Sequence, residues 1–154
     1  MKILILSDTH GETSAAQRII RSEAPDHVIH LGDCCRDAEE LDRDFPYLPI
    51  CRVAGNNDWF SDEAKEKNVR LGDVNIFLCH GHTTGVKSGL DLQTVRALQT
   101  GATVSLFGHT HSPYLREDGG ILLLNPGSIT YSDTYAILTL LPGQRPRAEI
   151  KYDR

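Results

Sequence analysis

Five short apolar runs in this chain each end in a cluster of aspartate, histidine or asparagine residues. The clusters are Asp8-Thr9-His10, Gly32-Asp33, Gly55-Asn56-Asn57-Asp58, His80-Gly81-His82 and His109-Thr110-His111. A short apolar run followed by turn residues is typical of a buried strand, so each cluster is expected where a strand gives way to a loop. Ligands of open α/β sheets collect at the carboxyl ends of strands, and all five clusters are expected at such ends.

Strand and helix patterns alternate in the first third of the chain. Strand-like runs at 2–7, 28–31 and 50–53 are separated by helical patterns at 13–23 and 36–43. Strands connected through helices pair in parallel, because the crossover returns the chain to the same end of the sheet. This part of the chain therefore predicts a parallel sheet with helices on its outer side.

Hairpin signals dominate the rest of the chain. Gly72-Asp73, Asp118-Gly119-Gly120 and Pro142-Gly143 each separate two strand-like runs, which predicts antiparallel pairs. Residues 103–107 form one more strand-like run, and residues 90–99 have helical spacing, with apolar side chains at Leu90, Val95 and Leu98. Together the two halves predict an α/β fold with two mixed sheets packed face to face and helices outside.

Length and charge restrict the classes of function. With 154 residues the chain has the usual size of one domain, so we expect a single domain over residues 1–154. The formal net charge of −5, without a lysine or arginine cluster, argues against binding of extended nucleic acid. No apolar stretch approaches the roughly 20 residues that span a bilayer, and a cleaved leader would remove Asp8, so we expect no membrane association. The four cysteines lack CxxC spacing and are interpreted as reduced thiols of a cytoplasmic protein.

The side chains in the five clusters are carboxylates, imidazoles and one amide, which bind divalent transition metals. Asp8 and His10 are two residues apart, so in extended backbone both side chains would point to one side, where one cation could take both. His109 and His111 repeat this spacing. Read alone, each cluster also has a structural interpretation, such as a turn, or a helix N-cap at Asp33. Five clusters in succession at strand ends are hard to explain by chance, so we predict a metal site.

The pattern D-x-H, G-D, G-N-x-D, an apolar strand ending in H-G-H, and G-H-x-H resembles the calcineurin-like metallophosphoesterase superfamily. The short length, the start at residue 8 and Asn125-Pro126-Gly127-Ser128 resemble its small bacterial and archaeal phosphodiesterase branch, which also holds the retromer subunit of eukaryotes. The resemblance covers nearly the whole chain. It implies a four-layer αββα sandwich, in which two mixed β-sheets pack face to face between flanking helices, with a di-metal centre between the sheet edges.

The resemblance also implies two divalent transition-metal ions, with manganese favoured and iron, cobalt, nickel or zinc as alternatives. One ion would be held by Asp8, His10, Asp33 and His111. The other would be held by Asp33, Asn56, His80 and His109, so that Asp33 bridges the two. Two metals about 3.5–4 Å apart lower the pKa of a shared water and clamp phosphoryl oxygens, so the expected nucleophile is a hydroxide that bridges the metals.

Asn57 departs from the family pattern. Many members have a histidine at this position, which helps to protonate the leaving oxygen, and asparagine has no titratable proton. We interpret His82 as a contact for the leaving group or the phosphate in its place, with an ordinary rim histidine as the alternative. Asp58 and Asn57 are expected to orient ligands or cap the loop rather than to bind metal. His27, His30 and the turn Asn125-Pro126-Gly127-Ser128 are interpreted as structural.

We therefore expect a metal-dependent phosphodiesterase that hydrolyses small phosphoesters. Phosphomonoesterase activity stays open, because the substrate phosphate would occupy the same metals. The alternative from another class is a non-catalytic scaffold that binds proteins, like the retromer subunit; filled positions for all seven ligands favour catalysis. A nuclease is disfavoured by the short chain and the lack of a basic surface. The physiological substrate and a homo-oligomeric state stay open.

Overall fold

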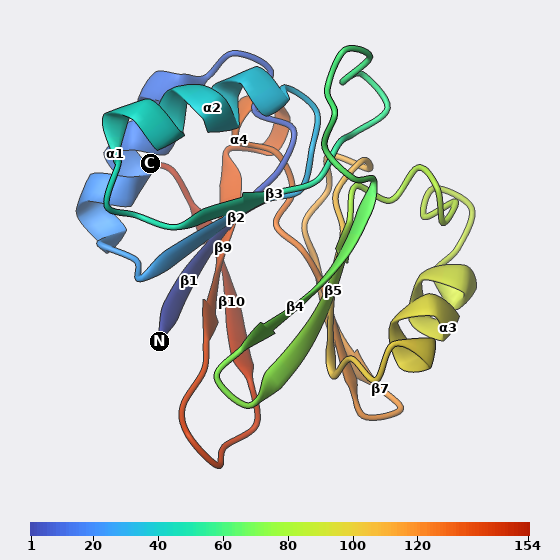
Figure 1. The fold of residues 1–154 in the computed structure, drawn as a ribbon. Coiled ribbons are helices and arrows are strands. Elements are labelled where there is room, and N and C mark those ends of the chain that lie inside the picture. Colours follow the sequence, from blue (N-terminus) through green and yellow to red (C-terminus); the bar gives the residue numbers. More distant parts are fainter.

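The computed structural model describes residues 1–154 and contains two five-stranded sheets that pack face to face (Figure 1). The first sheet has the order β10-β9-β1-β2-β3 and is built from β1 (Lys2–Leu6), β2 (His27–His30), β3 (Ile50–Arg52), β9 (Thr134–Thr139) and β10 (Arg147–Tyr152). The second has the order β4-β5-β6-β8-β7 and is built from β4 (Glu66–Leu71), β5 (Val74–Cys79), β6 (Val104–Leu106), β7 (Tyr114–Asp118) and β8 (Ile121–Asn125).

Both sheets are mixed, as the sequence predicts. In the first sheet β1, β2 and β3 run parallel, whereas the β9–β10 hairpin is antiparallel and joins the edge of β1. In the second sheet the β4–β5 and β7–β8 hairpins are antiparallel. Two pairings go beyond the hairpin pattern, because β6 lies parallel to both β5 and β8 inside the sheet. The carboxyl ends of β5, β6 and β8 therefore lie together at one edge of the second sheet.

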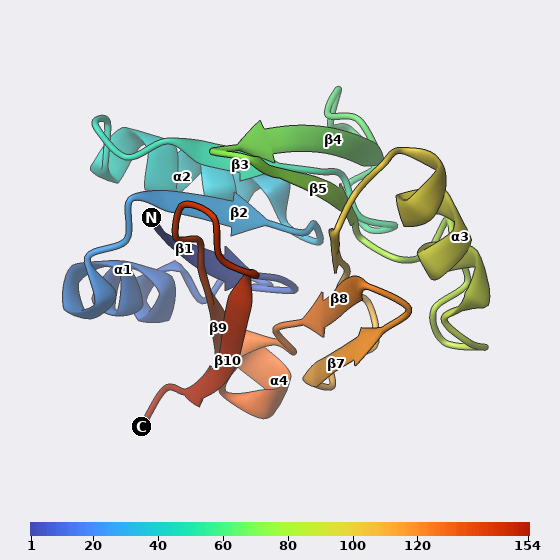
Figure 2. The same ribbon diagram turned by 90° about the horizontal axis from the view of Figure 1, so that it is seen from below.

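Three buried clusters separate four layers, which confirms the predicted αββα sandwich (Figure 2). Ile3 and Ile5 of β1 face the cluster between the sheets, whereas Leu4 and Leu6 face the outer cluster, as the period of two in a strand requires. Helices α1 (Thr13–Glu23) and α2 (Cys35–Asp44) cover that outer side, and α3 (Asp91–Gln99) covers the second sheet. The remaining helix, α4 (Ile129–Ser132), is a single turn. None of these helices has the length and apolar content that crossing a membrane requires.

The helix α3 is present where its spacing predicts it, but apolar residues do not mark its buried face. Val95 and Leu98 are 47% and 53% exposed, whereas Gln93 and Ala97 are buried. Gln93 can be buried because its amide is paired: Oε1 accepts a hydrogen bond from Thr84 Oγ1 at 2.6 Å, and Nε2 donates to a serine of β6 at 2.9 Å. A polar side chain whose partners are distant in sequence thus replaces the expected apolar contact.

Glu23 at the end of α1 anchors this helix to the first sheet. Its carboxylate forms an ion pair with Lys2 at 2.6 Å, accepts a hydrogen bond from the Tyr135 hydroxyl at 2.7 Å, and pairs with Lys151. Burial opposes ionisation of this group, but the hydrogen bonds from Lys151, Lys2 and Tyr135 outweigh it and lower the pKa of Glu23 to about 2. The ionised form of Glu23 therefore contributes to stability at neutral pH.

Candidate metal centre

The loops that carry the clusters have backbone conformations that are uncommon for residues with side chains. Eight non-glycine residues have positive φ, and five of them are Asp8, His10, Asp33, His109 and His111. Such conformations are unfavourable and concentrate at functional sites. They also show that the extended geometry expected for Asp8 and His10 is wrong, because φ is 52° at Asp8 and 44° at His10. The loop turns at both residues, and this turning rather than strand alternation brings their side chains together.

Two glycines allow the loops to approach one another closely. A Cβ atom on Gly32 would lie 2.6 Å from the backbone nitrogen of Gly55, and one on Gly108 would lie 2.0 Å from Ser7 Oγ. Real Cβ atoms essentially never come within 3.0 Å of another atom, so only glycine fits these positions. The loop after β2 thus packs on the loop after β3, and the loop after β6 packs on the end of β1. These contacts bring the clusters of both sheets within reach of one another.

Asp8, His10, Asp33 and His111 form a compact group of potential metal ligands. Each offers one potential ligand atom, and the four atoms lie within 4.8 Å of one another. His111 Nε2 is 3.1 Å from Asp8 Oδ1, and His10 Nε2 is 3.8 Å from the same oxygen and 3.9 Å from Asp33 Oδ2. The side chains of Asp8 and Asp33 are 0% and 2% exposed, and their only ion-pair partners are histidines.

His80 faces the same two carboxylates from the second sheet. Its Nδ1 lies 2.7 Å from the carbonyl oxygen of Leu31, which can only accept a hydrogen bond, so Nδ1 carries the proton. The lone pair therefore resides on Nε2 in the neutral ring. This atom is 3.5 Å from Asp33 Oδ1 and 3.7 Å from Asp8 Oδ1. In the neutral ring this lone pair faces two carboxylates, and a cation bound between them would remove the repulsion.

The other sequence-predicted residues lie around this group. The ring centroid of His109 is 5.0 Å from that of His80. Burial, followed by the nearby His80 and Lys87, lowers the pKa of His109 to about 4, so its ring is neutral and able to bind metal at pH 7. The His82 centroid lies 5.6 Å from that of His80. Asn56 is exposed, and no hydrogen bond joins it to the group.

Asn57 and Asp58 hold Asp33 in place. Asn57 donates hydrogen bonds to both Asp33 oxygens, from its backbone nitrogen at 3.0 Å and from Nδ2 at 2.7 Å. Asp58 accepts hydrogen bonds from four backbone amides, those of Asp33, Cys34, Cys35 and Gly55. Burial would raise the pKa of Asp58, but these amides stabilise the carboxylate and lower it overall. Asp58 therefore joins the loop after β2 to the loop after β3.

The turn Asn125-Pro126-Gly127-Ser128 supports the site directly, which its interpretation as a turn alone does not predict. Ser128 Oγ donates a hydrogen bond to the carbonyl oxygen of Asp8 at 2.7 Å. Asn125 Nδ2 donates to the carbonyl oxygen of Gly108 at 3.1 Å and to Thr110 Oγ1 at 2.9 Å. The turn thus fixes the backbone beside Asp8 and between His109 and His111, and its side chains do not enter the group of potential ligands.

A buried hydrogen-bond chain beneath the site is missed by the sequence analysis. His30 Nδ1 accepts from the Gly32 amide at 3.2 Å, so its Nε2 carries the proton and donates to Thr9 Oγ1 at 3.0 Å. Thr9 in turn donates to Asp37 Oδ2 at 2.5 Å, and Asp37 also accepts from the Gly11 amide. Burial lowers the pKa of His30, which keeps it neutral, in keeping with a structural role. Nothing in the sequence around Asp37 indicates that this acidic residue is buried.

The donor set fits a divalent transition metal. His10 Nε2, His80 Nε2 and His82 Nδ1 are buried and have no hydrogen-bond partner. Buried polar atoms are nearly always paired, so several unpaired nitrogens beside two buried carboxylates indicate a site for cations. Imidazole nitrogen together with carboxylate oxygen suits zinc, iron, nickel, cobalt and manganese, whereas calcium prefers a set of six to eight oxygens.

Comparison with known proteins identifies the family of this chain. Residues 1–141 match the model of the calcineurin-like phosphoesterase superfamily domain. The chain is 39% identical to a probable metallophosphoesterase of Bacillus subtilis, over 91% of this chain and 85% of that protein. It is 30% identical to a phosphodiesterase of Methanocaldococcus jannaschii, over 82% and 83% of the two chains. A crystal structure of Vps29 with zinc from Entamoeba histolytica shares the fold, with a TM-score of 0.76, 20% identity and full coverage of both chains. This chain therefore belongs to the calcineurin-like phosphoesterase superfamily.

Proposed function

We propose that the protein is a metal-dependent phosphodiesterase that hydrolyses small phosphoesters at a di-metal centre. Membership of a metallophosphoesterase family implies the use of divalent metal ions. The observation that carries the proposal is the unpaired Nε2 of His80, whose lone pair faces the buried carboxylates of Asp8 and Asp33. A cation bound between these groups would accept the lone pair and neutralise the carboxylates.

Two sets of side chains would hold the ions, and Asp33 would belong to both. The first set is Asp8, His10, Asp33 and His111; the second is Asp33, Asn56, His80 and His109. The two oxygens of Asp33 support a bridging role, because Oδ2 faces His10 whereas Oδ1 faces His80. When bound, two divalent ions supply a water of lowered pKa as nucleophile and positive charge that stabilises the phosphoryl oxygens.

His82 would contact the leaving-group side of the ester. Its buried Nδ1 has no partner within the protein, and its ring lies beside those of His80 and His109. We expect His82→Ala to slow esters with poor leaving groups more than esters with good ones, as measured by kcat/KM over a series of leaving-group pKa values. An equal loss on every ester would exclude contact with the leaving group.

A metal-resolved assay tests the main proposal. Protein stripped with a chelator is supplied with single divalent ions, and the substrates are bis(4-nitrophenyl) phosphate and 4-nitrophenyl phosphate, which share a leaving group. We expect turnover only with transition metals, with manganese the most effective and the diester preferred; Asp33→Asn should abolish it, and Asp62→Asn, at an exposed position, should not. Preference for the monoester would identify a phosphomonoesterase. No turnover with any metal would refute the proposal and favour the non-catalytic scaffold.

A further inference from the structure

A cavity of about 350 Å³ lies beside the proposed metal centre, under the loop that connects β3 to β4. Asn56 and His82, both assigned above to the reaction, form part of its wall, so the cavity is continuous with the place where the phosphoryl group would bind. Its volume is at the lower end of the range for small-molecule sites. A cavity of this size could hold one substituent of the ester.

The lining also includes Trp59, the one tryptophan of the chain. Its side chain is 82% exposed, although tryptophan gains more than other residues from contact with apolar or aromatic groups. The backbone beside it is well held. Asp58 is anchored by four amides, and the Ala54 amide donates to the Ala64 carbonyl at 2.9 Å, which closes the base of the loop. An ordered loop thus presents an indole to solvent beside the reacting centre.

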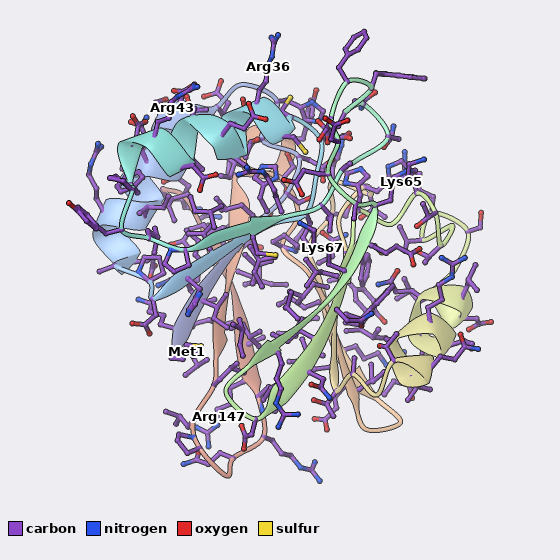
Figure 3. The ribbon with its side chains drawn as sticks, viewed as in Figure 1. Met1, Arg36, Arg43, Lys65, Lys67 and Arg147 are labelled. Carbon is purple, nitrogen blue, oxygen red and sulfur yellow. The ribbon has the colours of Figure 1, made fainter.

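The cavity wall carries two acidic side chains that already have partners and one ammonium group that has none. Glu63 is paired with Arg52 at 3.1 Å and with Lys67 at 2.7 Å, and Asp58 is occupied by backbone amides. Lys65 is exposed, forms no ion pair, and lies just before β4 at the base of the loop (Figure 3). An unpaired ammonium group near the indole disfavours cationic ligands such as quaternary amines, which would otherwise bind an aromatic face.

We propose that this cavity binds the nucleoside part of a nucleotide phosphoester, with the base stacked on Trp59 and Lys65 close to the phosphate. This inference rests on the proposed function and specifies its substrate class. Every nucleobase offers a flat aromatic face, and removal of a stacking aromatic side chain typically lowers affinity about 10-fold or more per base. Because stacking on an indole does not depend on the identity of the base, the site is expected to accept several bases.

Fluorescence gives a direct binding test, because Trp59 is the only tryptophan. The metal-loaded protein is titrated with adenosine 5′-monophosphate and with ribose 5-phosphate, which carries the phosphate without the base. Excitation at the red edge of tryptophan absorption avoids absorption by adenine. We expect the nucleotide to quench the fluorescence in a saturable way. Its affinity should be about 10-fold higher than that of ribose 5-phosphate, which is measured by competition with the nucleotide. Equal affinities, or binding of the nucleotide without a change in emission, would overturn the inference.

Kinetics separate this inference from the proposed function. The substrates are the 4-nitrophenyl ester of a nucleoside 5′-monophosphate and methyl 4-nitrophenyl phosphate, and the result is the ratio of their kcat/KM values. We expect Trp59→Ala to reduce the preference for the nucleoside ester about 10-fold, and Trp59→Phe to retain most of it. Phe60→Ala is the matched control, since Phe60 is fully exposed on the same loop but does not line the cavity. An unchanged ratio in Trp59→Ala would refute the subsite. If the wild type hydrolyses neither ester in the presence of metal, the proposed function is refuted instead.

Discussion

Replacement of Asp58 by asparagine tests how the site is built. Asp58 does not face the group of potential ligands, yet its carboxylate joins the loop that carries Asp33 to the loop that carries Asn56. The substitution Asp58→Asn keeps the size and shape of the side chain and removes the charge and one acceptor oxygen. We therefore expect it to weaken the junction between the two loops without creating a cavity.

The size of the effect follows from the hydrogen bonds. Oδ1 accepts from Cys34 and Cys35 at 2.9 and 2.8 Å, and Oδ2 accepts from Asp33 and Gly55 at 2.9 and 2.7 Å. An amide keeps one oxygen, so two of these N–H groups would face an NH₂ group that cannot accept. A hydrogen bond to a charged group contributes roughly 1.5–3 kcal/mol. Because Asp58 is only half-buried, water replaces part of the loss, and we expect a decrease in unfolding free energy of about 2 kcal/mol.

Urea denaturation with a chelator present measures this decrease as a lower midpoint with an unchanged slope. In thermal unfolding the same change corresponds to a Tm lower by roughly 4–8 °C for a chain of this length. Asp62→Asn is the matched control, because Asp62 is exposed on the same loop and forms no hydrogen bond. It should change stability by less than about 0.5 kcal/mol. Equal midpoints for the two variants would show that Asp58 does not hold the loops together.

Three further predictions concern stability and metal binding. Glu23→Gln should lower the unfolding free energy by about 1–2 kcal/mol at neutral pH. Folding lowers the pKa of Glu23 from 4.5 to about 2, so its stabilising effect is lost as the pH falls through this range. The difference between variant and wild type in urea midpoint should therefore shrink below pH 4.5 and vanish near pH 2. Tyr131 stacks on His111, with centroids 4.6 Å apart at 7°, so Tyr131→Ala should weaken metal binding about 10-fold in chelator competition, and Tyr131→Phe should not. Gly55→Ala would place a Cβ atom 2.1 Å from Asp33 Oδ1, and should lower the unfolding free energy by about 2–3 kcal/mol in urea denaturation.

The architecture was predictable because it is encoded in local patterns. The apolar run at Ile3–Leu6 and the turn signal at Gly72-Asp73 each act over a few residues, and the observed strands begin and end within a residue or two of the expected positions. The face that α3 buries was not predictable in this way. Gln93 is buried because Thr84 and a serine of β6 satisfy its amide, and such partners are visible only once the chain has folded.

The same distinction applies to the site. Residue types and their positions after strands indicated which side chains would gather, and the structure brings Asp8, His10, Asp33 and His111 together. The loop geometry that brings them together could not be predicted from the sequence, because left-handed φ angles depend on contacts between loops that are distant in sequence. The proton position on His80 depends in the same way on the Leu31 carbonyl, 49 residues away.

The geometry of the site disfavours the metal-free protein and favours an ion-bound one. Left-handed backbone at a non-glycine residue costs of order 1–3 kcal/mol, and five of the expected ligands adopt it. In addition, Asp8 and Asp33 face the lone pair of His80 and form no ion pair with a lysine or arginine. Contacts outside the ligand set, such as those of Asp58 and Ser128, offset part of this cost. On the proposed function, an ion that binds only the folded chain adds stability in proportion to the logarithm of its concentration over Kd. Folding and metal binding would then be one coupled equilibrium.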